Sequence, residues 1–181
     1  LYYMDSLQSP LVLNILKLAV IVTAVFIVMA LIAYFIKRAI KIKNNRPWLI
    51  KGSKNAKNSQ VISQDPKNEN SITLYRSDNE SGGSVFSYSF WFVIENMEYK
   101  FGEWKHIFHK GNKTSNPNRA PGVWIHPDKN ALRVYMNTMK NYLEHVDIDN
   151  IPIKRWVCCV VVLNGEYLDI YINGHLKKRK H

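Results

Sequence analysis

Three acidic residues in the stretch EHVDID, Glu144, Asp147 and Asp149, are the best candidates for catalysis in this sequence. A glycoside hydrolase needs two carboxylates about 5–9.5 Å apart across a cleft. Residues three apart in a strand point to opposite faces, so Glu144 and Asp147 do not share a cleft. Asp149 has no Glu partner further along the same strand. We interpret all three as edge and loop residues and predict a protein without catalytic residues.

Histidines and turn residues could instead hold a metal ion. His106 and His109, in HIFH, are three apart, so we expect them to face opposite ways as well. The remaining internal histidines are isolated: His126, His145 and His175. Asp128 and Asn130 could offer oxygen ligands to calcium, but a turn uses the same residue types for backbone reasons. With no phosphate loop or zinc spacing either, we predict no metal and no cofactor.

The two cysteines, Cys158 and Cys159, are adjacent. Neighbouring strand residues point to opposite faces, so these two cannot easily form a disulfide with each other. We interpret them as small apolar residues of a buried strand. A chain without a disulfide framework fits a reducing compartment.

The net charge of +11 is concentrated at the two ends of the folded region. Residues 71–176 contain as many basic as acidic side chains, and the last five residues add four positive charges. A basic run follows the apolar segment, with these members nearest to it: Lys37, Arg38, Lys41, Lys43 and Arg46. The run has few aromatic residues to stack on bases, which argues against nucleic-acid binding. Trp48 is better explained as an anchor at a membrane interface.

The segment 11–36 is predicted to be a transmembrane helix, preceded by a flank over residues 1–10. Its part 18–36 has nineteen residues without a charge and would span about 28 Å, close to the hydrocarbon thickness of a bilayer. Lys17 stands where its side chain can reach the headgroups. A signal peptide is the competing interpretation, but its charges would precede a shorter apolar region, and a small-residue cleavage site would follow.

The basic run also predicts the orientation of the helix. Lys and Arg are enriched on the cytoplasmic side of membrane spans, so we expect a single-pass membrane protein with its C-terminal domain facing the cytosol. Residues 37–70 then form a basic juxtamembrane segment and a polar linker rich in Asn, Lys, Ser and Gln. The sequons at Asn79 and Asn112 would not be glycosylated in the cytosol.

From residue 71 to residue 181 the sequence consists of short apolar and aromatic runs separated by turn residues. SITLYRS, at 71–77, is the first candidate strand, and Phe86, Tyr88, Phe90 and Phe92 alternate along a later one. Asn164-Gly165 and Asn173-Gly174 lie between apolar runs and predict hairpin turns. This pattern indicates an all-β antiparallel sandwich.

The domain resembles the concanavalin A-like, laminin-G-like jelly roll. The resemblance rests on the order FSYSFWF, IFHKG, PGVWIHPDKNALRVYMNT and VDIDNIPIKRWVCCVVVLNGEYLDIYINGHL. We expect its core and fold signature at Phe90, Trp91, Trp124, Trp156, Leu168, Ile170 and Gly174. In this family further strands follow the second Asn-Gly turn, so the resemblance implies that the sandwich is incomplete at His181 or that its open edge is covered otherwise.

A laminin-G-like domain behind one membrane span is similar to proteins that large double-stranded DNA viruses encode. The resemblance implies a structural role as a minor capsid protein of the virion. In such a virus the domain would face the capsid from an internal membrane. The expected partners are the lipid bilayer and capsid or other virion proteins. The alternative is a membrane-anchored lectin that binds carbohydrate.

Overall fold

The computed structural model describes residues 10–77, 79–80 and 82–181, and the side chains of residues 41–44, 79 and 80 lie outside this description. The chain divides into two compact units, Leu1–Tyr75 and Arg76–His181. The second unit therefore begins five residues later than the domain start expected from the sequence. The two units are described separately below.

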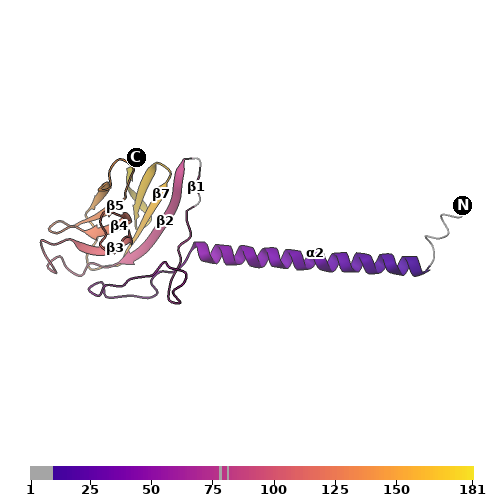
Figure 1. The fold of residues 1–181 in the computed structure, drawn as a ribbon. Helices are drawn as coiled ribbons and strands as arrows, with labels where there is room; N and C mark the ends of the chain where they lie inside the picture. Colours follow the sequence, from indigo (N-terminus) through magenta and orange to yellow (C-terminus); the bar gives the residue numbers. More distant parts are fainter. Residues whose placement is uncertain (1–9, 78, 81) are drawn as a thin grey trace. The chain divides into compact units, whose positions relative to one another are not determined.

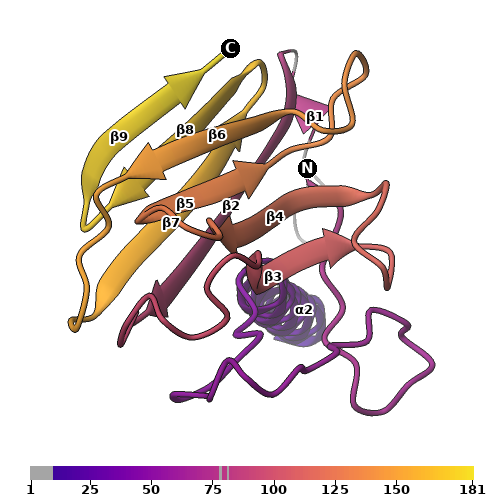
Figure 2. The same ribbon diagram turned by 90° about the vertical axis from the view of Figure 1, so that its left-hand side faces the viewer.

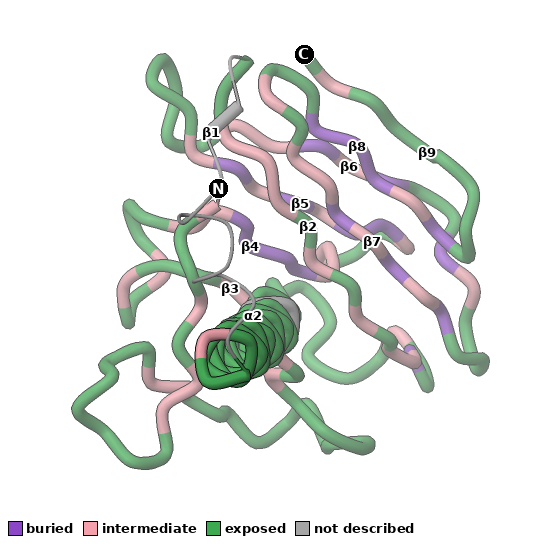
Figure 3. The backbone as a smooth tube through the Cα atoms, turned by 90° about the vertical axis from the view of Figure 1, so that its right-hand side faces the viewer, coloured by how far each residue is buried: buried purple, intermediate pink, exposed green. Residues whose placement is uncertain are grey.

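Helix α2, Pro10–Asn45, is the only helix among the described residues. It begins with proline at a first-turn position, where the missing N–H is not needed. Pro10–Ile40 is apolar and long enough to cross a membrane, a test that a signal sequence also passes. The large apolar side chains along it are exposed, and the tube of this helix is mostly in the colour of exposed residues in Figure 3. A helix with no polar face is suited to lipid.

The helix is longer than the predicted segment 11–36, because it continues through the basic run. Lys and Arg are good helix formers, and no glycine or proline interrupts the sequence before Pro47. Lys17, Lys37 and Arg38 are exposed on it, while Lys41 and Lys43 belong to it with side chains outside the described part. Arg46 and Trp48 follow the helix, and Trp48 is 74% exposed.

Residues 46–77 form no helix or strand in the described structure. The segment contains tight turns. In two of them the Asn58 N–H donates to Asn55 O at 3.1 Å and the Asn68 N–H donates to Asp65 O at 3.0 Å. The strand predicted over 71–77 is absent. Because the Ile72 N–H donates to the carbonyl of Ser63, this stretch is held by a local loop contact rather than by a sheet.

The second unit is a sandwich of two antiparallel sheets, which Figures 1 and 2 show as two layers. One sheet has the strand order β1-β2-β7-β8-β9, and the other has the order β3-β4-β5-β6. The strands are β1 Asn79–Glu80, β2 Gly83–Phe92, β3 Lys105–Gly111, β4 Arg119–Ile125, β5 Ala131–Tyr135, β6 His145–Asp149, β7 Val157–Asn164, β8 Tyr167–Ile172 and β9 His175–Lys180. The predicted all-β antiparallel sandwich is confirmed.

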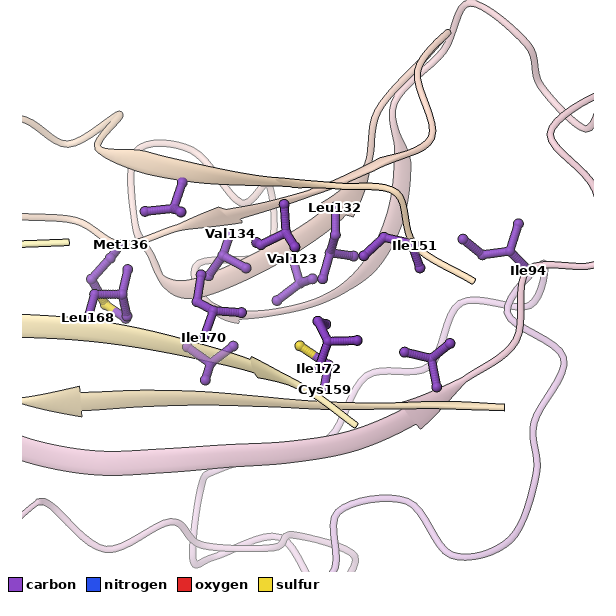
Figure 4. Packing of buried hydrophobic residues seen from close by; sticks show 14 residues of the cluster. Ile94, Val123, Leu132, Val134, Met136, Ile151, Cys159, Leu168, Ile170 and Ile172 are labelled. Atoms are coloured by element: carbon purple, nitrogen blue, oxygen red, sulfur yellow. The ribbon is translucent and has the colours of Figure 1, made fainter. Parts of the chain in front are cut away.

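The core lies between the sheets and receives side chains from both layers (Figure 4). Val123, Leu132 and Val134 come from the four-stranded sheet, and Cys159 and Ile170 from the five-stranded sheet. Strand β7 is apolar from Val157 to Leu163, but only Val157, Cys159 and Val161 are fully buried. Its other face carries Cys158, Val160 and Val162, which are half-buried. The second face of this sheet is therefore not part of the core.

Leu168 and Ile170 of the predicted core signature lie in the core, but none of its three tryptophans does, since Trp124 is buried on the opposite face of its sheet. Trp124, Leu168 and Ile170 are buried, and Phe90 packs against the buried cluster. Trp91 is 62% exposed because it alternates with Phe90 and Phe92, which face inward. Trp156 is 55% exposed because it precedes β7, and Ile151 fills the core at this entry instead.

Both predicted hairpins form, with one shift. The first turn consists of Gly165-Glu166, because Asn164 already pairs with Tyr167. The second is Asn173-Gly174, and both of these residues have φ > 0 (51° and 83°), as a two-residue turn of type I′ requires. The basic tail that follows is itself strand β9. Lys180 on it makes an ion pair with Glu144, which connects the edges of the two sheets.

Candidate functional site

The face of the four-stranded sheet opposite the core carries aromatic, basic and histidine side chains, which we call the outer-face cluster. Val123 and Val134 pair across β4 and β5 and point into the core, so their neighbours point outward. Register places Trp124 beside both His106 and Arg133, and Tyr135 beside His145. The cluster comprises His106, His109, Arg119, Trp124, Arg133, Tyr135, His145 and Asp147.

Trp124 lies at the centre of the outer-face cluster and is only 8% exposed. Its ring is stacked on that of His109 (centroids 6.1 Å apart, 18° between planes) and meets the edge of Tyr135 at 5.3 Å. Gly122 makes this position possible, since a Cβ atom there would lie 2.4 Å from the Trp124 ring. The indole is therefore covered by its neighbours and offers no open ring face.

Arg119 differs from the other charged residue pair of the cluster because it packs against aromatic rings and not against an acid. Its guanidinium carbon lies 3.9 Å from the Tyr135 ring centroid and 5.4 Å from that of Trp124. Its Nε is buried and has no hydrogen-bond partner, and no ion pair joins it to an acid in the part of the chain that the structure describes. The side chain of Asn137 accepts a hydrogen bond from the Arg119 backbone N–H, which holds the residue at the start of β4.

Arg133, by contrast, has its acid partner on the adjacent strand. Its Nε and one terminal nitrogen donate to the two carboxylate oxygens of Asp147, both at 2.6 Å. This bidentate bond keeps the pKa of Asp147 below its ordinary value. The guanidinium also lies over Trp104, 4.7 Å from the ring centroid. Arg133 and Asp147 thus form a neutral pair, and Arg119 remains as the uncompensated cation.

The two histidines of β3 contradict the expectation that they face opposite ways. His106 Nε2 and His109 Nδ1 are 2.8 Å apart. Register shifts between His106 and Phe108, and again between His109 and Gly111, interrupt the alternation of this strand. Burial and the neighbouring His109 lower the pKa of His106. Bulges of this kind leave no clear sequence signal, which is why the pair was missed.

The acids and turn residues singled out in the sequence are occupied with other contacts. Glu144 pairs with Lys180 and Asp147 with Arg133, and these cations lower the pKa of both carboxyls. Both are therefore ionised at neutral pH, which is unsuited to a general acid. Asp149 is exposed.

In the HPDKN turn Asp128 Oδ1 lies 2.8 Å from His126 Nδ1, and the Asn130 side chain donates to Ile151 O. Among the described residues no group of three or more His, Cys, Asp or Glu side chains could hold a metal.

Residues 52–181 match the laminin G type of the concanavalin A-like lectin/glucanase superfamily. The chain belongs to this superfamily. None of the curated proteins compared with it matches. The superfamily match and the two-layer sandwich agree with the resemblance carried by the strand motifs. The matched region begins inside the segment 46–77, which we call the tether.

Sequence reasoning found the strands of this superfamily domain but not its outer-face cluster. The strands ALRVY and HVDID alternate between core and outward positions, so Arg133 and His145 could have been assigned to one face. Arg119 could not, because it lies five residues before Trp124 and strict alternation would place the two on opposite faces. The membrane-related residues Lys17 and Trp48 belong to the first unit. Lys17 lies within helix α2, and Trp48 lies three residues after its end.

Proposed function

We propose that the chain is a non-enzymatic, membrane-anchored binding protein. Helix α2 holds it in a bilayer, and a partner binds to the outer-face cluster of the sandwich. The observation that carries this proposal is Arg119, a cation half-buried among Tyr135 and Trp124 without an acid partner in the described structure. A partner that places a carboxylate there would complete the ion pair and satisfy the buried Nε.

The partner that fits best is an acidic surface of another protein. A sugar-binding site usually presents an open aromatic ring, whereas Trp124 is 8% exposed and Tyr135 is capped by Arg119. Arginine is enriched in protein interfaces and forms bidentate contacts with carboxylates. In a virus with an internal membrane, the partner would be a protein of the capsid shell, and the chain would be a minor capsid protein beneath it.

The tether is suited to such a link. Residues 46–77 form no helix or strand. Once its local turns open, a chain of about 30 residues has a root-mean-square end-to-end distance of roughly 30 Å, so the sandwich could then search a volume of that radius from the bilayer. The cytosolic orientation rests on the basic residues after the apolar stretch, and it gives the sandwich access to cytosolic partners.

Protease added outside sealed microsomes tests the orientation directly. We expect digestion of residues 46–181, with the helix left in the membrane. Protection of the sandwich, or a mass shift removed by endoglycosidase, would reverse the orientation and end the proposal of a cytosolic partner.

Particles stripped of their bilayer test the partner. We expect a fraction of the wild-type protein to stay on the shell and Arg119→Gln to be lost with the lipid, because the variant keeps the size but not the charge. Lys129→Gln, an exposed turn position, is the matched control and should behave as the wild type. Loss of all wild-type protein with the lipid would remove the case for a shell contact.

Carbohydrate binding is the second candidate, favoured by the superfamily match. It requires the sandwich to lie on the lumenal or outer side of the membrane, where the sequons at Asn79 and Asn112 are accessible to glycosylation. A glycan array probed with the detergent-solubilised chain tests it. Binding to an acidic sugar that Arg119→Gln abolishes would favour this candidate over a protein partner.

A further inference from the structure

We propose that His106 and His109 form a two-histidine site for a divalent transition metal ion such as Zn²⁺. The site lies on β3, the edge strand of the four-stranded sheet. It goes beyond the proposed partner binding, since it needs neither Arg119 nor an anchored helix.

The position of the two nitrogens is the first argument. His106 Nε2 and His109 Nδ1 approach to 2.8 Å, so both rings direct a nitrogen at the same point. Zinc–nitrogen bonds of about 2.0–2.1 Å at tetrahedral angles place two ligating nitrogens roughly 3.3 Å apart. The two nitrogens would therefore have to move apart by about half an ångström, with a tilt of the rings, to admit the ion. His106 is exposed, so its ring can make this movement.

The second argument is the state of His109. Its other nitrogen, Nε2, lies 2.9 Å from the backbone carbonyl of Asn112. A carbonyl can only accept, so Nε2 carries the proton, and Nδ1 keeps its lone pair. A metal-ligating histidine usually donates its second N–H to a carbonyl or carboxylate, which fixes the ring and its tautomer. His109 already has this arrangement.

His106 is the adaptable member of the pair. Beside a neutral His109 it donates from Nε2, and a tautomer change that moves this proton to Nδ1 frees Nε2 for the ion. Both rings rest against Trp124, at centroid distances of 5.1 and 6.1 Å.

The described residues supply no third protein ligand. Water must therefore fill the remaining positions, which makes this an open site of moderate affinity rather than a closed structural one. The bulges on both sides of His109 produce the pair, so the site depends on an irregularity of the edge strand and not on a sequence motif.

The test uses the full chain in detergent micelles, without a histidine tag, titrated with Co²⁺ as a spectroscopic probe and with Zn²⁺ by calorimetry. We expect visible d–d absorption and one ion per chain. His106→Gln and His109→Gln should each weaken binding at least about tenfold, since loss even of an outer-shell partner typically costs 10–100-fold. His145→Gln is the matched control on the same face, and it should bind as the wild type does.

Two results would overturn the proposal: no Co²⁺ absorption from the wild type at saturating metal, or equal weakening by His145→Gln and His106→Gln. Near-ultraviolet circular dichroism of each variant distinguishes loss of a ligand from loss of the fold. Arg119→Gln, which tests the partner surface, should leave metal binding intact, so failure of one proposal can be told from failure of the other.

Discussion

At the scale of the residue, Ile170 and Trp156 allow a direct test of where the core lies. Ile170 is fully buried between the sheets, whereas Trp156 is 55% exposed before β7. Ile170→Ala removes buried methyl groups and leaves a cavity, so we expect a loss of about 2–5 kcal/mol in the free energy of unfolding. Trp156→Ala should cost less than about 1 kcal/mol. Denaturant unfolding in detergent measures both, and a larger loss for Trp156→Ala would contradict the core assignment.

Asp147 gives a prediction about pH. Asp147→Asn leaves Arg133 half-buried without its bidentate partner, and we expect a loss of about 1–3 kcal/mol at pH 7. Because the ion pair lowers the pKa of Asp147, its contribution is present above the ordinary carboxyl pKa and is lost as the pH falls below about 4. The difference between wild type and variant should therefore shrink in acid.

Unfolding midpoints measured at pH 7, 5 and 3 check this dependence. Asp149→Asn, two residues along on an exposed position of the same strand, is the control and should change stability by less than about 0.5 kcal/mol at every pH. A difference that persists unchanged at pH 3 would show that the Asp147 carboxylate is not the group responsible.

Residue types predicted the inward-facing part of the fold better than they predicted the outer face. Leu168 and Ile170 could be assigned to the core because apolar residues recur at every second position there. Trp91 could not, since aromatic residues occupy both faces of β2 and composition alone does not say which face is inside. The outer-face cluster depends on pairing between strands, which a single sequence does not specify.

At the scale of the element, the two hairpin glycines differ in their surroundings. Gly165 has φ +61°, and a Cβ there would lie 2.4 Å from Gly82 O, whereas Gly174 has φ +83° and open space. Gly174→Ala should cost about 1 kcal/mol from backbone strain alone. Gly165→Ala should cost clearly more, because the backbone around Gly82 must also move. Thermal unfolding of the two variants side by side measures the difference.

Element types were predictable where the pattern is long and regular, and element ends were not. The apolar segment could be predicted as a helix, but its continuation to Asn45 depends on the helix propensity of basic residues, which the hydropathy pattern does not record. The stretch 71–77 has strand composition yet finds no partner strand, so the tertiary context decides against it. The bulges that join His106 to His109 could not have been predicted for the same reason.

At the scale of the whole molecule, the apolar helix α2 leads to a prediction about which conditions extract the protein from a membrane. If Pro10–Ile40 spans the bilayer, as we propose, the apolar helix holds the protein by insertion, and headgroup attraction adds little. Washing membranes with about 1 M salt, which reduces the Debye length to roughly 3 Å, should release none of it, while detergent should release it readily. Release into the salt wash, detected by immunoblotting, would show that the helix does not span the bilayer.

The connection between the tether and the sandwich has a mechanical consequence. The chain passes from residues 46–77 into β1 and β2, and the length of β2 from Val85 to Phe92 is paired with β7. If the proposed anchor and the proposed partner are both engaged and move apart, the pull enters the sandwich through its N-terminal strands, β1 and then β2. A load along that strand stretches all of its ladder hydrogen bonds together, in shear, and does not peel them one at a time. The flexible tether would take up small displacements as slack, and beyond that length β2 would resist the force while the edge strand β9 stayed unloaded.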